Sequence, residues 1–159
     1  MQPVASYIRT QGMICAVINV VLNPVVVWLM YRQLDFVPLW GRNSIVVDTA
    51  LTSVILSLLV TLFTTGGLRR AMQTGRVTAT GEFPRAGGLL SYLPKQAWPL
   101  GLLLGLAMAC VLTPFTFGLF QAFSYSGLPL AWFALFKAMY TGPLGFALTR
   151  WVILRQLLG

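Results

Sequence analysis

Histidine is absent from this chain of 159 residues, and only Asp35, Asp48 and Glu82 are acidic. The sequence therefore offers no catalytic triad, no pair of catalytic carboxylates and no carboxylate-rich metal site. Its two cysteines, Cys15 and Cys110, lack the CxxC spacing of a redox enzyme and the paired thiols of a soft-metal carrier. We expect no enzyme activity, no metal and no cofactor.

Charge is also scarce: charged residues make up 9% of the chain and hydrophobic residues 57%. The hydrophobic residues form four long runs separated by charges, at residues 11–31, 45–65, 99–120 and 128–153. A helix of about 20 apolar residues crosses the roughly 30 Å hydrocarbon core of a bilayer, and helices satisfy their own backbone hydrogen bonds there. The sequence predicts an all-α integral membrane protein with one domain over residues 1–159, a bundle of four transmembrane helices. The first run lacks a small-residue cleavage pattern before Arg32, which favours a retained helix over a signal peptide.

Basic residues concentrate between the second and third runs. Residues 66–98 contain five basic side chains, Arg69, Arg70, Arg76, Arg85 and Lys95, against Glu82 alone. The positive-inside rule then places this loop and both termini in the cytoplasm, most simply at a bacterial inner membrane. Anionic lipids are the expected partners of this loop. The formal charge of +8 thus has a topological explanation, and the absence of a recognition module argues against nucleic-acid binding.

Two of the predicted spans each contain a charge, Asp48 in the second and Lys137 in the fourth. A threonine follows each charge four residues later, Thr52 and Thr141. An unpaired charge at the bilayer centre costs roughly 2.5 to 3.5 kcal/mol, so such residues are usually paired. We predict that Asp48 and Lys137 contact each other.

A weak internal repeat brings the same residues into register. A shift of 89 residues places Asp48 over Lys137 and Thr52 over Thr141, and one further residue places Asn23-Pro24 over Thr113-Pro114. Each half would be a two-helix hairpin, and the halves would be related by a pseudo-twofold axis along the membrane normal. The alternative is two unrelated hairpins in one bundle.

Counted along the helices, the polar residues of the four spans fall at similar depths. Asp48, Lys137, Asn23 and Thr113 are expected to form a polar layer near the midplane, with Asn19 one turn from Asn23 on the same face. Asparagine and threonine oxygens could accept the remaining donors of the lysine. The layer is either a proton- or ion-sensitive transport site or a buried staple that fixes helix register.

Small residues define two further surfaces. Gly101, Gly105 and Ala109 form a seam of GxxxG type that lets a second helix approach closely, within the bundle or in a second copy. A ridge of hydroxyl residues follows the second span at every fourth position, namely Thr49, Ser53, Ser57, Thr61 and Thr65. Because a four-residue step rotates around the helix by about 40°, this ridge cannot line one pore throughout and is expected to pack.

Two functions fit these features. The first is a small inner-membrane transporter or channel-type protein, with Asp48, Lys137, Asn19 and Asn23 as its polar site and a homo-oligomer formed through the Gly101–Ala109 seam. The second is a non-catalytic accessory or assembly subunit of a larger membrane complex, in which the Asp48–Lys137 pair is a staple.

Overall fold

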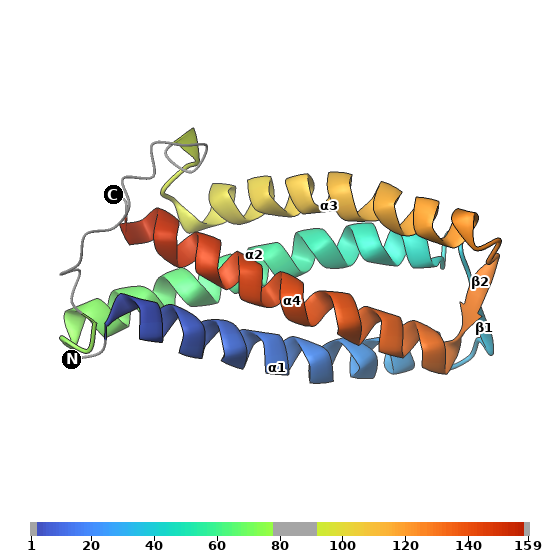
Figure 1. Cartoon of the computed structure of the whole chain (residues 1–159), viewed down its shortest axis with the longest axis horizontal. Coiled ribbons are helices and arrows are strands. Elements are labelled where there is room, and N and C mark those ends of the chain that lie inside the picture. The colour runs from blue at the N-terminus through green and yellow to red at the C-terminus, as the bar shows by residue number, and fades with distance from the viewer. Residues whose placement is uncertain (1–2, 78–91, 158–159) are drawn as a thin grey trace.

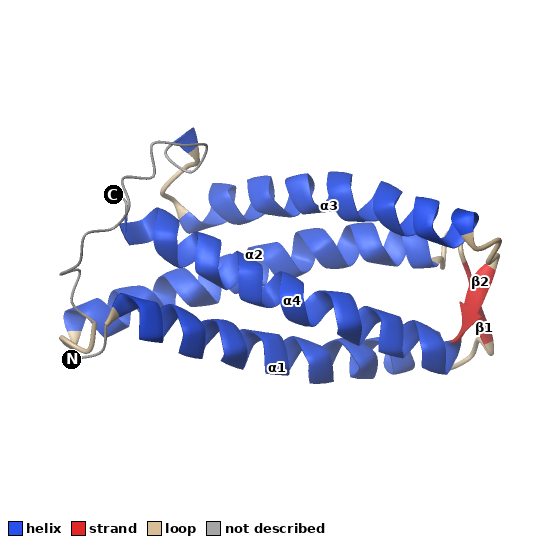
Figure 2. Cartoon of the chain, in the orientation of Figure 1, coloured by secondary structure: helices blue, strands red, loops and turns tan. Residues whose placement is uncertain are grey.

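The computed structural model describes residues 3–77 and 92–157. In this part of the chain the fold is helical apart from two very short strands (Figure 1 and Figure 2). In chain order the elements are α1 (Val4–Tyr31), β1 (Phe36–Pro38), α2 (Ile45–Gln73), α3 (Ala97–Ala122), β2 (Gly127–Pro129) and α4 (Leu130–Leu157).

Each predicted span corresponds to one helix, and the helices are longer than predicted, with 28, 29, 26 and 28 residues. At 1.5 Å per residue they measure roughly 40 Å and exceed the hydrocarbon core of a bilayer. Helix α2 continues to Gln73, so the predicted loop at 66–98 begins later. The part of that loop at 78–91, with Glu82 and Arg85, lies outside the described residues.

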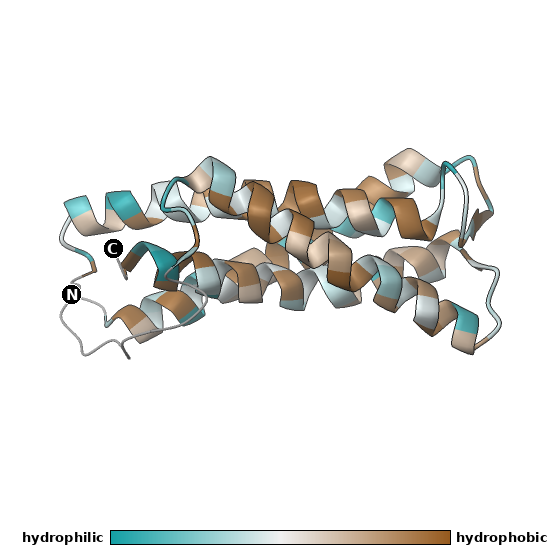
Figure 3. Cartoon of the chain, turned by 90° about the horizontal axis from the view of Figure 1, so that it is seen from above, coloured by the Kyte–Doolittle hydropathy of each residue, from teal (hydrophilic) through white to brown (hydrophobic). Residues whose placement is uncertain are grey.

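Three helices, α1, α2 and α3, are long and apolar enough to cross a membrane. Helix α4 is as long, yet it does not meet the same measure of hydropathy within the described residues. The mean hydropathy of α4 is lowered by Lys137 and by the Thr141-Gly142-Pro143 segment. Polar residues gather toward both ends of the bundle, with apolar residues between them (Figure 3). The protein is therefore membrane-embedded by three helices, and the fourth predicted span is supported only as a helix.

The helices do not pack as two consecutive hairpins. Helix α1 packs mainly against α4, and α2 packs mainly against α3, while α2 and α4 contact each other in the centre. Neither α1 with α2 nor α3 with α4 forms an extensive contact. The hairpins expected from sequence are therefore not packing units, because each helix finds its main partner in the other half of the chain.

The two loops at one end of the bundle are joined by β1 and β2. The strands pair antiparallel, with Val37 opposite Leu128, and the Leu39 N–H donates to the Ser126 carbonyl at 2.7 Å. The sequence predicted no strand, since three-residue strands are too short to show alternation. This pair closes the end opposite the start of α1 and the end of α4 (Figure 1).

Gly127 permits this strand pair. A Cβ atom at Gly127 would meet the Val37 carbonyl oxygen and would lie 2.7 Å from the Phe36 ring. We expect Gly127→Ala to lower the free energy of unfolding by about 1 to 3 kcal/mol, the usual cost of overpacking. Chemical denaturation in detergent measures the change. Gly118→Ala, where a Cβ would meet nothing within 4 Å, is the control and is expected to be neutral or stabilising.

Glycine also sets the helix contacts. Gly101 and Gly105 lie against α2, where added Cβ atoms would be 3.0 Å from the Leu58 Cα and 2.9 Å from the Val54 Cα. This seam is covered by α2 of the same chain and cannot hold a second copy, which corrects the expected route to a homo-oligomer; Ala109 is only half-buried. Ser57 and Thr61 of the hydroxyl ridge face the same glycines, so this part of the ridge is a packing surface.

Candidate functional site

The Asp48 carboxylate and the Lys137 ammonium form a direct ion pair inside the bundle. The Lys137 Nζ lies 2.8 Å from Oδ1 and 2.8 Å from Oδ2 of Asp48. The two side chains are 6% and 2% exposed. Residues 89 positions apart are thus brought together as predicted, and the pair joins the central helices α2 and α4.

Local sequence explains why α2 carries a carboxylate here. Ser44 precedes the helix and its Oγ accepts the Val47 N–H at 3.3 Å, so the helix begins with a side-chain cap. Asp48 lies in the first turn, where the positive end of the helix dipole stabilises an anion. Lys137 of α4 supplies the counter-charge from across the bundle.

The depth of the pair differs from the prediction. Asp48 is three residues after the start of α2, about 5 Å along its axis, and so lies toward the β1–β2 end. The sequence predicted a layer near the midplane, whereas the chain up to Ser44 is strand and turn and the helix begins only at Ile45. The pair lies between two apolar clusters, one containing Val27 and Phe133 and the next containing Leu104 and Leu148.

Four of the predicted polar residues lie near the pair, but of these only Thr52 hydrogen-bonds to one of its charged groups, and the expected contacts of asparagine and threonine oxygens with the Lys137 ammonium do not form within the described part of the chain. The Thr52 hydroxyl donates to Asp48 Oδ2 at 3.4 Å. The Thr141 hydroxyl lies 2.7 Å from the Lys137 carbonyl and 3.4 Å from the Asn19 carbonyl, so it connects α4 to α1. The Asn23 amide donates to both the carbonyl and the side-chain oxygen of Asn19, at 3.0 and 3.1 Å. Four of the predicted neighbours are therefore found close to the pair: Asn19 and Asn23 on α1, Thr52 on α2 and Thr141 on α4.

Thr113 is the predicted member that does not join. Its hydroxyl is buried and forms no hydrogen bond within the described residues. Helix α3 packs on α2, whereas Asn19 and Asn23 belong to α1, which packs on α4. The alignment of Asn23 with Thr113 therefore does not place the two side chains in one hydrogen-bonded layer.

Two tyrosines near Asp48 were missed by the sequence reasoning. Tyr31 at the end of α1 and Tyr140 on α4 both lie close enough to the Asp48 carboxylate to interact with it. Tyr140 follows Lys137 by three residues and so shares its helix face, a signal that the sequence already contained. Its hydroxyl is buried without a hydrogen bond among the described residues.

The ion pair forms part of the wall of a groove between α1 and α2. Near the β1–β2 end this groove has a volume of about 300 Å³, and its polar lining residues are Asn19, Asn23, Tyr31, Arg42, Asn43, Asp48, Thr52 and Lys137. Apolar side chains of α1 and α2 form the rest of the lining. The groove exists because α1 and α2 both pack on α4 without packing extensively on each other.

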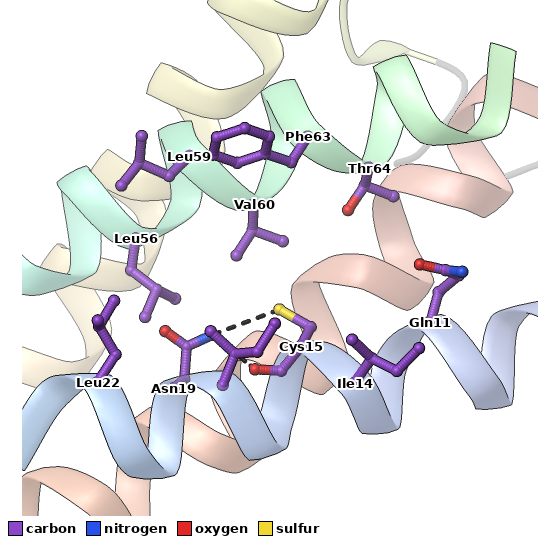
Figure 4. A pocket seen from close by; sticks show the side chains of 11 residues that line it. Gln11, Ile14, Cys15, Asn19, Leu22, Leu56, Leu59, Val60, Phe63 and Thr64 are labelled. Carbon is purple, nitrogen blue, oxygen red and sulfur yellow. Dashed lines mark hydrogen bonds between the residues drawn. The ribbon is translucent and has the colours of Figure 1, made fainter. Parts of the chain in front are cut away.

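The same groove continues along α1 and α2 away from the β strands (Figure 4). This second stretch has a volume of about 400 Å³ and shares Asn19, Leu22, Leu56 and Leu59 with the first. The polar stretch of the groove, at Asp48 and Lys137, therefore adjoins an apolar stretch that is open along one side of the bundle. An amphiphilic molecule could place its polar group at Asp48 and Lys137 from this side.

Comparison with family models, with curated proteins and with solved structures gives no match for this chain.

Proposed function

We propose that this chain is a small membrane transporter or channel-type protein in which the Asp48–Lys137 pair meets a polar substrate group through the α1–α2 groove. One observation carries the proposal: both charges of the pair line an open groove together with Asn19 and Asn23. A buried pair that served only to fix two helices would gain nothing from such an opening. Ionisable groups within membrane helices are more often functional than incidental.

In the proposed mechanism, the substrate group competes for one member of the pair. An anionic group near Lys137, or a cationic group near Asp48, would weaken the contact between the two side chains, and the contact between α2 and α4 would loosen. Pro143 on α4 and Pro24 on α1 interrupt the helices close to this layer and supply the points at which they can bend. One groove along the side of the bundle does not enclose a water-filled path across the membrane, so we expect transport to require a homo-oligomer.

A non-catalytic accessory or assembly subunit is the second candidate. The geometry of the ion pair favours this role, since both carboxylate oxygens of Asp48 lie 2.8 Å from the Lys137 ammonium and the pair joins the two central helices, α2 and α4. A staple needs this geometry and no substrate. Such a subunit would co-purify with a fixed partner complex, whereas a transporter would be purified without one.

The proposal includes a membrane orientation. We propose that all four helices cross, because α4 contacts both α1 and α2 and its Lys137 is neutralised by Asp48. Arg9, Arg69 and Arg70 lie toward the end that carries the start of α1 and the end of α2, and this end would face the cytoplasm of a bacterial inner membrane.

We also propose a tandem duplication of a helix–strand–helix unit. The element order repeats, and β1 pairs with β2. A twofold axis through Val37 and Leu128 would exchange α1 with α3 and α2 with α4, in agreement with the observed packing of α1 on α4 and α3 on α2. Asp48 and Lys137 would then contact each other at the axis.

Thiol labelling tests whether the site is open to substrate. In a chain with Cys15 and Cys110 replaced by alanine, we expect Thr52→Cys to react with a membrane-impermeant thiosulfonate, because Thr52 is half-buried and lines the groove. Ser53→Cys is the matched control, since Ser53 is fully buried on the same helix. Equal protection of both cysteines would contradict the transport proposal and favour the accessory subunit. Reaction at position 52 alone supports transport.

A further inference from the structure

The α1–α2 groove extends beyond the apolar stretch to the helix ends opposite the β strands. There its volume is about 600 Å³ and its lining includes Arg70, Arg76, Tyr7, Thr10 and Gln11. Gln11 also lines the neighbouring apolar stretch, so the basic end adjoins that stretch.

The basic end carries unbalanced positive charge. Arg70 and Arg76 line it, and none of its lining residues is acidic. Within residues 3–77 and 92–157 the one salt bridge is Asp48–Lys137, so neither arginine has a carboxylate partner there. Phosphate groups in proteins are commonly bound by two guanidinium groups together with hydroxyl and amide donors.

The adjoining stretch is apolar and open. Ile14, Ile18 and Phe63, which line it, are 48%, 53% and 77% exposed. In Figure 4 Leu56 and Val60 of α2 point toward the α1 side chains across this space. From Gln11 to Leu22 the helix rises by about 16 Å, which is close to the thickness of one leaflet of the hydrocarbon core, about 15 Å.

We infer that the basic end of this groove binds an anionic phospholipid, with its phosphate between Arg70 and Arg76 and an acyl chain along Ile14, Ile18 and Phe63. Charge complementarity selects the headgroup, and the length of the apolar stretch matches the chain. The lipid site uses other residues than the Asp48–Lys137 pair, so either can fail without affecting the other.

Native mass spectrometry of the purified full chain in detergent, titrated with phosphatidylglycerol, tests this site. Each arginine near an anionic headgroup contributes about fivefold in affinity, so the Arg70→Gln, Arg76→Gln double variant should bind about 30-fold more weakly. Phosphatidylcholine should bind the wild type much more weakly than phosphatidylglycerol. Equal retention of the two lipids would overturn the inference.

A matched control distinguishes a specific binding site from general electrostatic attraction. Arg9→Gln with Arg69→Gln removes the same charge at the same end of the bundle from residues that do not line the basic groove, and it should change binding by less than about fivefold. If this control loses as much affinity as Arg70→Gln with Arg76→Gln, the attraction is diffuse and no site exists. All four arginines are exposed, so folding should be preserved.

The acyl chain is tested separately. Ile18→Trp fills the apolar stretch and should reduce phosphatidylglycerol binding, whereas Val21→Trp, on the exposed side of α1 outside the groove, should not. Unchanged binding by Ile18→Trp would overturn the assignment of the groove. Excess inorganic phosphate should not displace the lipid, and displacement would show a site for a soluble anion instead.

Discussion

Asp48→Asn is expected to lower the free energy of unfolding by about 3 to 5 kcal/mol, the cost of removing one partner of a buried ion pair. Lys137 is 2% exposed, and Asp48 is its ion-pair partner among the described residues. Asparagine keeps the size of the side chain but leaves the ammonium without a counter-charge. Denaturant titration in detergent measures the loss. A change below about 1 kcal/mol would mean that the pair contributes little to stability.

Removing both charges should behave differently. Asp48→Leu with Lys137→Leu is expected to recover most of the lost stability, since apolar replacements of a buried pair are often neutral or stabilising. Exchange of the charges, Asp48→Lys with Lys137→Asp, should recover only part of it, because position 48 lies in the first turn of α2, where the helix dipole disfavours a cation. A stable double-leucine variant that has lost function in the cell would assign the charges to mechanism, and a functional one would make them a staple.

Gly105→Leu is the second change with a large expected effect, a loss of about 3 kcal/mol or more. A Cβ atom at this position would lie 2.9 Å from the Val54 Cα and 3.1 Å from the Val54 carbonyl oxygen, both backbone atoms of α2 that cannot turn aside. Overpacking of a core usually costs 1 to 3 kcal/mol, and contact with backbone falls at or above the upper end of about 3 kcal/mol. Denaturant titration in detergent again measures the loss.

Gly118→Leu is the control for this change. It lies on the same helix, α3, but an added Cβ would meet nothing within 4 Å. It should therefore leave stability within about 0.5 kcal/mol of wild type, as surface changes usually do. Equal losses at positions 105 and 118 would contradict the close packing of α3 on α2.

The two changes probe two kinds of contact that hold α2 in place. On one side Gly101 and Gly105 bring α3 to van der Waals distance, and on the other the Asp48–Lys137 pair joins α2 to α4. Helix α1 is attached differently, since its extensive packing is on α4, through Gly12, Gly142 and Gly145, and it shares apolar clusters with α2 only toward its two ends. This arrangement leaves the groove in which both the proposed polar site and the inferred lipid site lie.

The sequence alone determined the membrane class, the positions of four helices and the contact between Asp48 and Lys137. Each follows from a local or strongly constrained rule: apolar length predicts a helix, and a charge in an apolar helix must find its counter-charge. The partners Asn19, Asn23, Thr52 and Thr141 follow from the same rule, because they lie one turn from each other or from the charges.

Which helices pack together was decided only by tertiary structure. The apolar faces of the four helices have similar compositions and do not specify which helix each one contacts. The hydrophobic pattern of the sequence therefore could not indicate that α1 packs mainly on α4 and not on α2. The three-residue strands, the exclusion of Thr113 and the burial of the Gly101–Gly105 seam within the chain all follow from that choice. The groove follows from it as well, because it is the space left where two consecutive helices do not pack closely along their length.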